Sequence, residues 1–150
     1  MAQRVRIRRL RPEVRLPAYE SGGAAAFDLA AAEDVVIEPG RVALVPTGLV
    51  IEVPPGFALG IFARSSTPLK RGLMIANGVG IVDSDYCGPA DEVKIAVMNF
   101  TAAPVTVSAY TVVDGGCAVG VQLNGSDSPV TGSHEHETPP EPSRFANRIE

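Results

Sequence analysis

Glycine and proline punctuate the chain at short intervals, and this spacing constrains the possible folds more than any other feature. The 150 residues include 15 glycines and 13 prolines. The stretch "DVVIEPGRVALVPTGLVIEVPPGFALGIFA" alternates short apolar runs with turn signals at residues 39–40 and 54–56. "RVRIRRL", "AAFDLAA", "EVKIAVMNF" and "APVTVSAYTVV" continue the pattern. Short strands spaced by about ten residues predict an all-β sandwich or barrel.

Two segments differ from this pattern. "SSTPLKRG" can hold one helical turn, with Ser65 or Ser66 as the N-cap and Pro68 as the opening residue. From about Asn124 the sequence becomes polar, rich in proline and poor in aliphatic residues. We therefore expect a β domain over residues 1–123 and a disordered tail over residues 124–150.

Charge and composition limit the partners and the compartment. The net charge of −4 argues against nucleic acid as a bulk partner. The arginines of "RVRIRRL" either contact nucleic acid or, as we favour, form the solvated face of a strand. The sequence has no apolar run of 18 residues and no apolar segment behind its charged start, so we expect neither a membrane span nor a signal peptide. Two cysteines without metal-type spacing, Cys87 and Cys117, favour a reducing cytoplasm.

The histidines restrict the chemistry of the domain. His134 and His136 are the only two, and both lie in the polar tail. This placement argues strongly against a Ser-His-Asp or Cys-His site in the body of the domain. Acid–base chemistry there must use carboxylates, lysine or tyrosine.

Three motifs contain candidate site residues, and each also has a purely structural interpretation. In "ARSST", Arg64 and the two following serines can bind an anion, or they can form a helix cap beside a surface arginine. In "AAAFDL", Asp28 lies in an apolar stretch, so it needs a partner, and a divalent ion on a phosphate chain would suit it.

The third motif, "NGVGIVDSDYCG", is either a plain hairpin with solvated acids and a core tyrosine or a ligand-binding hairpin. Gly78 and Gly80 allow a flat ligand to approach the backbone, and the Asn77 amide offers both a donor and an acceptor. Tyr86 can stack on a sugar. Asp83 follows the apolar pair Ile81-Val82, so we expect it to be partly desolvated and usable as a general base.

Taken together and in this order, the three motifs resemble those of the trimeric dUTP diphosphatase (dUTPase) family. "AAAFDLAAAEDVVIEPG" is similar to the first family motif, "ARSS" to the second and "NGVGIVDSDYCG" to the third. The resemblance covers residues 3–107. It implies a jelly-roll-like β-barrel or sandwich (a β-clip fold), a homotrimer with sites at the subunit interfaces, and Mg²⁺-assisted hydrolysis of dUTP to dUMP and pyrophosphate. This reaction clears dUTP from the nucleotide pool and supplies dUMP for dTMP synthesis.

The resemblance also implies a role for each matching residue. Asp83 corresponds to the general base that activates the attacking water, and Tyr86 to the tyrosine beneath the deoxyribose. Asn77 and the backbone from Gly78 through Gly80 to Val82 correspond to the uracil-reading segment. The phosphate-binding motif corresponds to Arg64, Ser65 and Ser66, and the acid that reaches the metal through water corresponds to Asp28.

Residues 108–150 do not resemble the fourth and fifth family motifs. "SAYTVVDGGCAVGVQL" lacks the expected basic residue, and "PSRFANRIE" lacks a glycine-rich arm. We therefore expect reduced activity, with a catalytically weak or inactive nucleotide-binding protein as the alternative. A dCTP deaminase is disfavoured because Leu69 stands where an arginine would be required and "KIAVMNF" has no catalytic glutamate.

Overall fold

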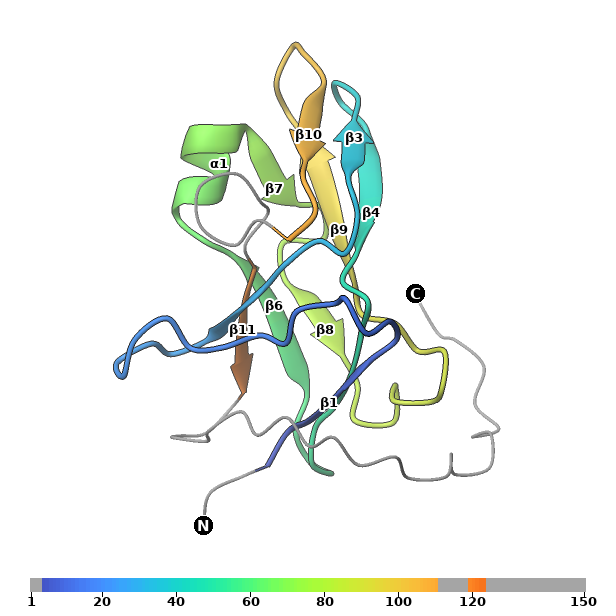
Figure 1. Ribbon diagram of the computed structural model, residues 1–150. Coiled ribbons are helices and arrows are strands. Elements are labelled where there is room, and N and C mark those ends of the chain that lie inside the picture. Colours follow the sequence, from blue (N-terminus) through green and yellow to red (C-terminus); the bar gives the residue numbers. More distant parts are fainter. Residues whose placement is uncertain (1–3, 111–118, 124–150) are drawn as a thin grey trace.

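The computed structural model describes residues 4–110 and 119–123, with side-chain environments for residues 4–110. In this part of the chain the fold is all-β with one short helix, as the sequence predicts (Figure 1). The elements are β1 (Arg6–Arg9), β2 (Phe27–Leu29), β3 (Val35–Ile37), β4 (Val42–Pro46), β5 (Leu49–Glu52), β6 (Leu59–Ala63), α1 (Ser66–Arg71), β7 (Leu73–Ile75), β8 (Gly80–Val82), β9 (Lys94–Asn99), β10 (Val105–Val107) and β11 (Val119–Leu123).

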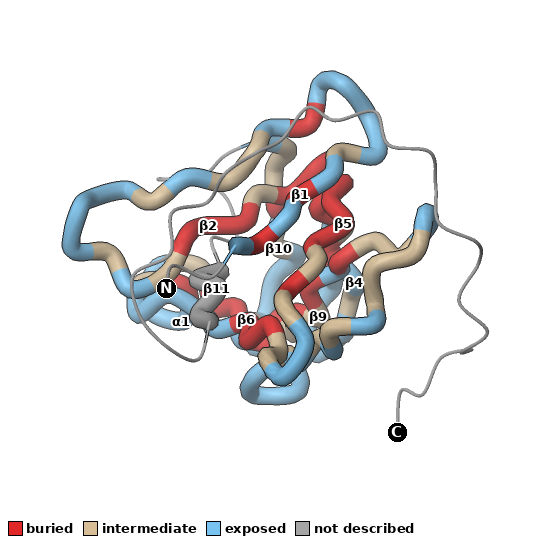
Figure 2. The backbone as a smooth tube through the Cα atoms, turned by 90° about the horizontal axis from the view of Figure 1, so that it is seen from below, coloured by how far each residue is buried: buried red, intermediate tan, exposed pale blue. Residues whose placement is uncertain are grey.

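Within the described residues, the strands form four small antiparallel sheets around one apolar core. Their orders are β2-β11-β6-β8, β4-β9-β7, β1-β5 and β10-β3. The fully buried side chains come from several of these sheets and include Phe27, Leu29, Ile51, Leu59 and Ile95. Figure 2 shows this buried material running through β2, β5, β6 and β9.

The predicted turns and face alternation are confirmed. Gly40 and Gly56 have φ of 69° and 86°, a conformation that glycine adopts without the steric cost of a Cβ. On β1, Ile7 is buried while Arg6 and Arg8 are exposed. Arg6 pairs with Glu52 on β5 at 3.2 Å, so the basic face of this strand is a solvated face in the folded chain.

The helix prediction is confirmed in position and corrected in detail. Ser65 is the N-cap of α1, but it lies in the αR region and makes no side-chain cap hydrogen bond. Pro68 is the third residue of the helix rather than its first. It still lies in the first turn, where its missing N–H leaves no helical hydrogen bond unmade.

Within the described residues, no helix has the length and apolar character needed to cross a membrane. The predicted disordered tail, residues 124–150, lies outside the described residues, so the domain boundary near residue 123 stays a prediction.

Candidate active site

The first and second motifs meet through an ion pair. Asp28 lies in the middle of β2 with a side chain only 10% exposed, and Arg64 directly follows β6. Arg64 Nη1 donates to Asp28 Oδ2 at 3.2 Å. Burial raises the pKa of the Asp28 carboxyl; the Arg64 cation opposes this rise and nearby Glu20 adds to it. The sequence requirement for a partner of Asp28 is thus met by Arg64.

The two serines of the second motif lie at the start of α1, with Ser65 as its N-cap and Ser66 as its first residue. Ser65 is exposed, Ser66 is half-buried, and Thr67 is buried beneath them. Because the Ser65 side chain forms no cap bond, its exposed hydroxyl is accessible to a ligand beside Arg64. A charged fork and hydroxyl donors at one place are suited to phosphate oxygens.

The third motif is not the tight hairpin that the sequence predicts. The strands on either side of the 76–79 turn belong to different sheets, because β7 pairs with β9 and β8 pairs with β6. The turn itself is closed by Gly78 N–H donating to Ile75 O at 3.0 Å, and Gly78 has φ of 75°. Asn77 is exposed at its tip. This segment therefore crosses from one sheet to another.

Strand β8 is an edge strand, which gives its backbone a free side. It is the last strand in the order β2-β11-β6-β8 and pairs only with β6 among the described strands. A Cβ added at Gly80 would come within 3.1 Å of Ile61 Cβ, so glycine permits the close approach of β8 to β6. The unpaired N–H and C=O groups along the other side can read the edge of a planar ligand.

Asp83 and Tyr86 follow β8 in a turn closed by Tyr86 N–H donating to Asp83 O at 3.1 Å. The predicted desolvation of Asp83 is wrong for the single chain, because Asp83 is exposed and Ile81 is 63% exposed. Tyr86 is half-buried, and its hydroxyl donates to Glu92 O at 3.3 Å. Burial raises the pKa of Tyr86, and Asp91 and Glu92 raise it further, so the hydroxyl stays protonated.

Glu92 is a supporting residue that the sequence reasoning missed. Its Oε1 accepts from Gly48 N–H at 2.8 Å, and its side chain is 18% exposed. This hydrogen bond connects Glu92, whose carbonyl accepts from the Tyr86 hydroxyl, to Gly48 at the start of β5. The only sequence signal was an acid placed directly before the apolar "VKIAV" run.

The candidate residues form two clusters at opposite corners of one sheet. In the strand registers, Asp28 lies opposite Gly120 and Gly120 opposite Phe62, whereas Leu59 lies opposite Val82. Asp83 thus lies three strands across and about four residues along from Asp28, a separation of roughly 20 Å. Figure 1 shows α1 at one end of the β6-β8 pair and the chain leaving β8 at the other end.

The donor set limits the kind of metal site that one copy can form. The described residues contain no group of three or more His, Cys, Asp or Glu side chains placed to hold a metal ion. Asp28 is a single buried carboxylate beside a candidate phosphate-binding element. Such a site fits Mg²⁺, which commonly keeps several waters and binds through one or two carboxylates together with substrate phosphates.

Comparisons with known proteins agree with the motifs. The dUTPase family model matches residues 12–113. The chain is 46% identical over 96 residues to the deoxyuridine 5'-triphosphate nucleotidohydrolase of Desulfitobacterium hafniense, and the match covers 62% of each protein. It therefore spans less than two thirds of that relative.

Solved structures agree as well. The dUTPase of Streptococcus mutans superposes with a TM-score of 0.68 at 32% identity, over 83% of this chain and 93% of that one. A mutant dUTPase from phage phi11 of S. aureus, described with a coordinated structural Mg(II) ion, has the same fold, with a TM-score of 0.69 at 20% identity over 89% and 99% of the two chains. The predicted dUTPase-type β fold is confirmed, and the chain belongs to the dUTPase family.

Proposed function

We propose that this protein hydrolyses dUTP to dUMP and pyrophosphate at sites shared between the copies of a homotrimer. The observation that supports the shared site is the separation of roughly 20 Å between the Asp28–Arg64 pair and Asp83. A general base must lie within hydrogen-bond reach of the proton it removes. A phosphate donor and a base that act on one nucleotide cannot lie that far apart, so two copies must contribute.

Asp83 acts as the general base. It takes a proton from the water that attacks the α-phosphorus, and the bond to the bridging oxygen breaks to release pyrophosphate. Its exposure in one chain leaves it open to solvent. Its environment in the assembled site is completed by another copy. General-base catalysis of this kind is worth about 100-fold or more in rate.

Recognition of the nucleoside uses the edge strand and the tyrosine. The backbone from Gly78 through Gly80 to Val82, which includes the unpaired side of β8, and the Asn77 amide hydrogen-bond the edge of uracil. Tyr86 packs under the deoxyribose and leaves no room for a 2′-hydroxyl. Its hydroxyl bond to Glu92 O fixes the ring, which supports a steric role rather than a proton-transfer role.

Phosphate binding uses the other cluster. Arg64 and the hydroxyls of Ser65 and Ser66 donate to the phosphate oxygens. Asp28 would hold Mg²⁺ through a water molecule, and the bound ion would supply charge neutralisation for the triphosphate. In the single chain Arg64 pairs with Asp28, so both side chains already lie together where the phosphate chain and the ion would bind. The reducing cytoplasm, suggested by the cysteine content, is the proposed place of action.

Subunit complementation tests the shared site. Asp83→Asn and Arg64→Ala chains should each release pyrophosphate from dUTP at no more than about one hundredth of the wild-type rate. When the two inactive chains are mixed, unfolded and reassembled together, intact sites form from one copy's Asp83 and another's Arg64, so activity should return. Failure to recover activity in mixed oligomers whose composition is verified by mass spectrometry would refute a site shared in this way. If wild type binds dUTP in calorimetry but releases no pyrophosphate, the chain is instead the inactive nucleotide-binding alternative.

A further inference from the structure

We propose that Glu92 is a positioning residue that fixes Tyr86 and thereby controls how strongly the site prefers a deoxyribose to a ribose nucleotide. This inference rests on the proposed function, in which the Tyr86 ring packs under the sugar. It adds the residue that determines where the ring lies, because Glu92 connects the tyrosine hydroxyl to the buried part of the fold.

The backbone of Glu92 holds the tyrosine hydroxyl. The Tyr86 hydroxyl donates to Glu92 O at 3.3 Å. This distance is long for a hydroxyl hydrogen bond, so the bond can restrain the ring only if the acceptor itself does not move. Burial, Asp91 and Glu92 all raise the pKa of Tyr86, so the hydroxyl keeps the proton that it donates. The position of the ring therefore depends on what holds Glu92.

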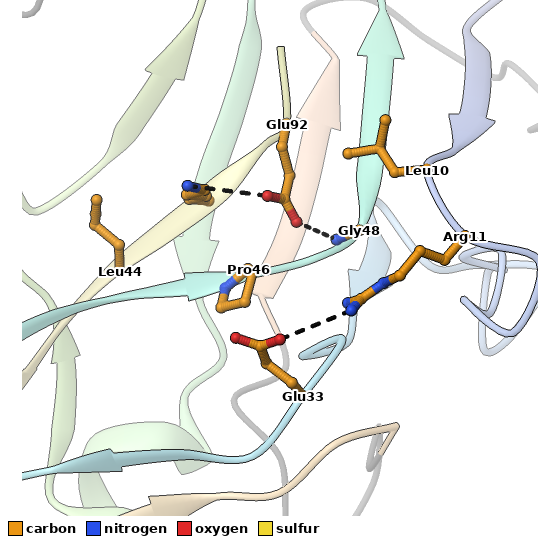
Figure 3. Close-up of a pocket in the computed structure, with 8 residues that line it drawn as sticks. Leu10, Arg11, Glu33, Leu44, Pro46, Gly48 and Glu92 are labelled. Carbon is orange, nitrogen blue, oxygen red and sulfur yellow. Dashed lines mark hydrogen bonds and ion pairs between the residues drawn. The ribbon is translucent and has the colours of Figure 1, made fainter. Parts of the chain in front are cut away.

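The side chain of Glu92 is attached to the turn between β4 and β5. Figure 3 shows its carboxylate in the wall of a groove, pointing toward Gly48. Glu92 Oε1 accepts from Gly48 N–H at 2.8 Å, whereas Oε2 lies 3.9 Å from the Nζ of the exposed Lys94. A charge-assisted hydrogen bond to a backbone N–H is stronger than a solvent-exposed ion pair, so the bond to Gly48 is the main anchor.

The peptide unit that contains the accepting carbonyl is held at both ends. The Glu92 C=O and the Val93 N–H belong to one planar unit, and the N–H donates to Leu49 O at 2.8 Å. The other end of the unit is the Cα of Glu92, which the carboxylate attaches to Gly48. Both anchors lie in the stretch 47–49, whose residues are all buried. Without the carboxylate the unit would be held at one end only.

The loop between Tyr86 and Glu92 has supports of its own. Arg8 Nη2 donates to Gly88 O at 3.1 Å, and Gly88 N–H donates to Asp91 Oδ2 at 2.8 Å. Loss of the Glu92 carboxylate leaves both bonds in place, so the loop should stay folded while the Glu92 peptide unit gains freedom. The change is then confined to the carbonyl that holds the tyrosine.

A fixed ring and a movable ring differ in the sugars that they admit. A ribose has one hydroxyl more than a deoxyribose, and a site rejects it through a steric clash. That clash is costly only if the ring cannot move away from the added oxygen. Freedom of Tyr86 should therefore weaken the rejection of UTP more than it weakens the binding of dUTP.

The test is the ratio of kcat/KM for dUTP to kcat/KM for UTP. Glu92→Ala removes the anchor, so this ratio should fall at least about tenfold. Glu92→Gln keeps an oxygen that can accept from Gly48 N–H, so its ratio should lie closer to wild type than to Glu92→Ala. Lys94→Gln is the matched control, because it removes only the exposed ion pair and should leave the ratio unchanged. A merely structural defect lowers both rates together and does not move the ratio.

Tyr86→Phe tests whether Glu92 acts through the tyrosine. It keeps the ring but removes the donor to Glu92 O, so the ratio should fall, and adding Glu92→Ala should then change it little. A wild-type ratio in Glu92→Ala or in Tyr86→Phe would overturn the proposal, and so would an equal effect of Glu92→Ala in both backgrounds. If circular dichroism shows that Glu92→Ala is unfolded, Tyr86→Phe decides alone.

Failure of the proposed function gives a different result. A wild type that releases no pyrophosphate from dUTP contradicts hydrolysis, but the same variants then test the positioning role through the ratio of the Kd values for UTP and dUTP in calorimetry. Equal affinity of wild type for the two nucleotides, or no binding of either, would overturn the role of Glu92. A wild type that hydrolyses and prefers dUTP, with a Glu92→Ala variant that keeps this preference, would overturn the positioning role and leave the function intact.

Discussion

Replacement of Arg64 by glutamine tests whether the Asp28–Arg64 pair offsets the cost of a buried acid. Exposed ion pairs contribute about 0.2–1 kcal/mol, whereas removing one partner of a fully buried pair costs about 3–5 kcal/mol. This pair lies between those limits, since the Asp28 side chain is 10% exposed and that of Arg64 40%. We expect Arg64→Gln to lower the free energy of unfolding by about 1–2 kcal/mol near pH 8.

The effect should depend on Asp28 and on pH. Asp28→Asn removes the charge that burial disfavours, so it should leave stability within about 0.5 kcal/mol of wild type or raise it, and Arg64→Gln should then have little further effect. Because burial raises the pKa of Asp28, the folded chain binds this proton more tightly than the unfolded chain does. The ionised group therefore reduces stability as pH rises above its ordinary pKa of 3.8. Loss of Arg64 raises that pKa further. The loss of unfolding free energy in Arg64→Gln should therefore be largest near pH 8 and shrink toward pH 4.

Urea unfolding followed by circular dichroism measures the stability of wild type, Arg64→Gln, Asp28→Asn and the double variant at one protein concentration. The result that would refute the reasoning is a deficit for Arg64→Gln that is equally large in the Asp28→Asn background, or one that grows as pH falls. Either would mean that Arg64 stabilises the fold through contacts other than its charge on Asp28.

Three further changes have expected outcomes in the same unfolding assay. Asn99 is fully buried and donates to Ile37 O and Ala103 O while accepting from Thr101 N–H and Oγ1, all at 2.8 Å, so Asn99→Ala should cost about 3 kcal/mol or more. Gly72→Ala should cost at least about 2 kcal/mol, because φ is 62° and the new Cβ would lie 1.9 Å from Thr101 Cγ2. Adding Thr101→Ser should recover the part due to that clash. Tyr110 has φ of 59°, so Tyr110→Asn should be more stable than Tyr110→Val by about 1 kcal/mol, and equal stability would contradict backbone strain there.

The sequence predicted the strands well because turn signals and face alternation are local properties. The turns at Gly40 and Gly56, the alternation of β1 and the short helix after Arg64 were all foreseen in this way. The pairing of β7 and β8 was not, because both strands have the composition of hairpin strands and the choice of partner depends on distant segments. Their actual partners, β9 and β6, lie on opposite sides of them in the sequence.

The prediction that Asp83 is partly desolvated was wrong for a related reason. A preceding apolar pair indicates burial only if the fold of one chain covers it, and here Ile81 points to solvent. By contrast, the need of Asp28 for a cation could be inferred, since any fold that buries "FDL" must pair the acid. Glu92 could not be identified as a support for the tyrosine segment, because its partner Gly48 lies 44 residues away.

Strand β8 presents an exposed edge in the single chain. It ends the order β2-β11-β6-β8 and pairs only with β6 among the described strands, so the backbone groups along its other side are free. An edge strand with free backbone groups favours uncontrolled association with other strands. If a nucleotide covers this edge, as we propose, the exposed backbone has a specific occupant. The groups that read the base are then the same groups that would otherwise pair with another chain.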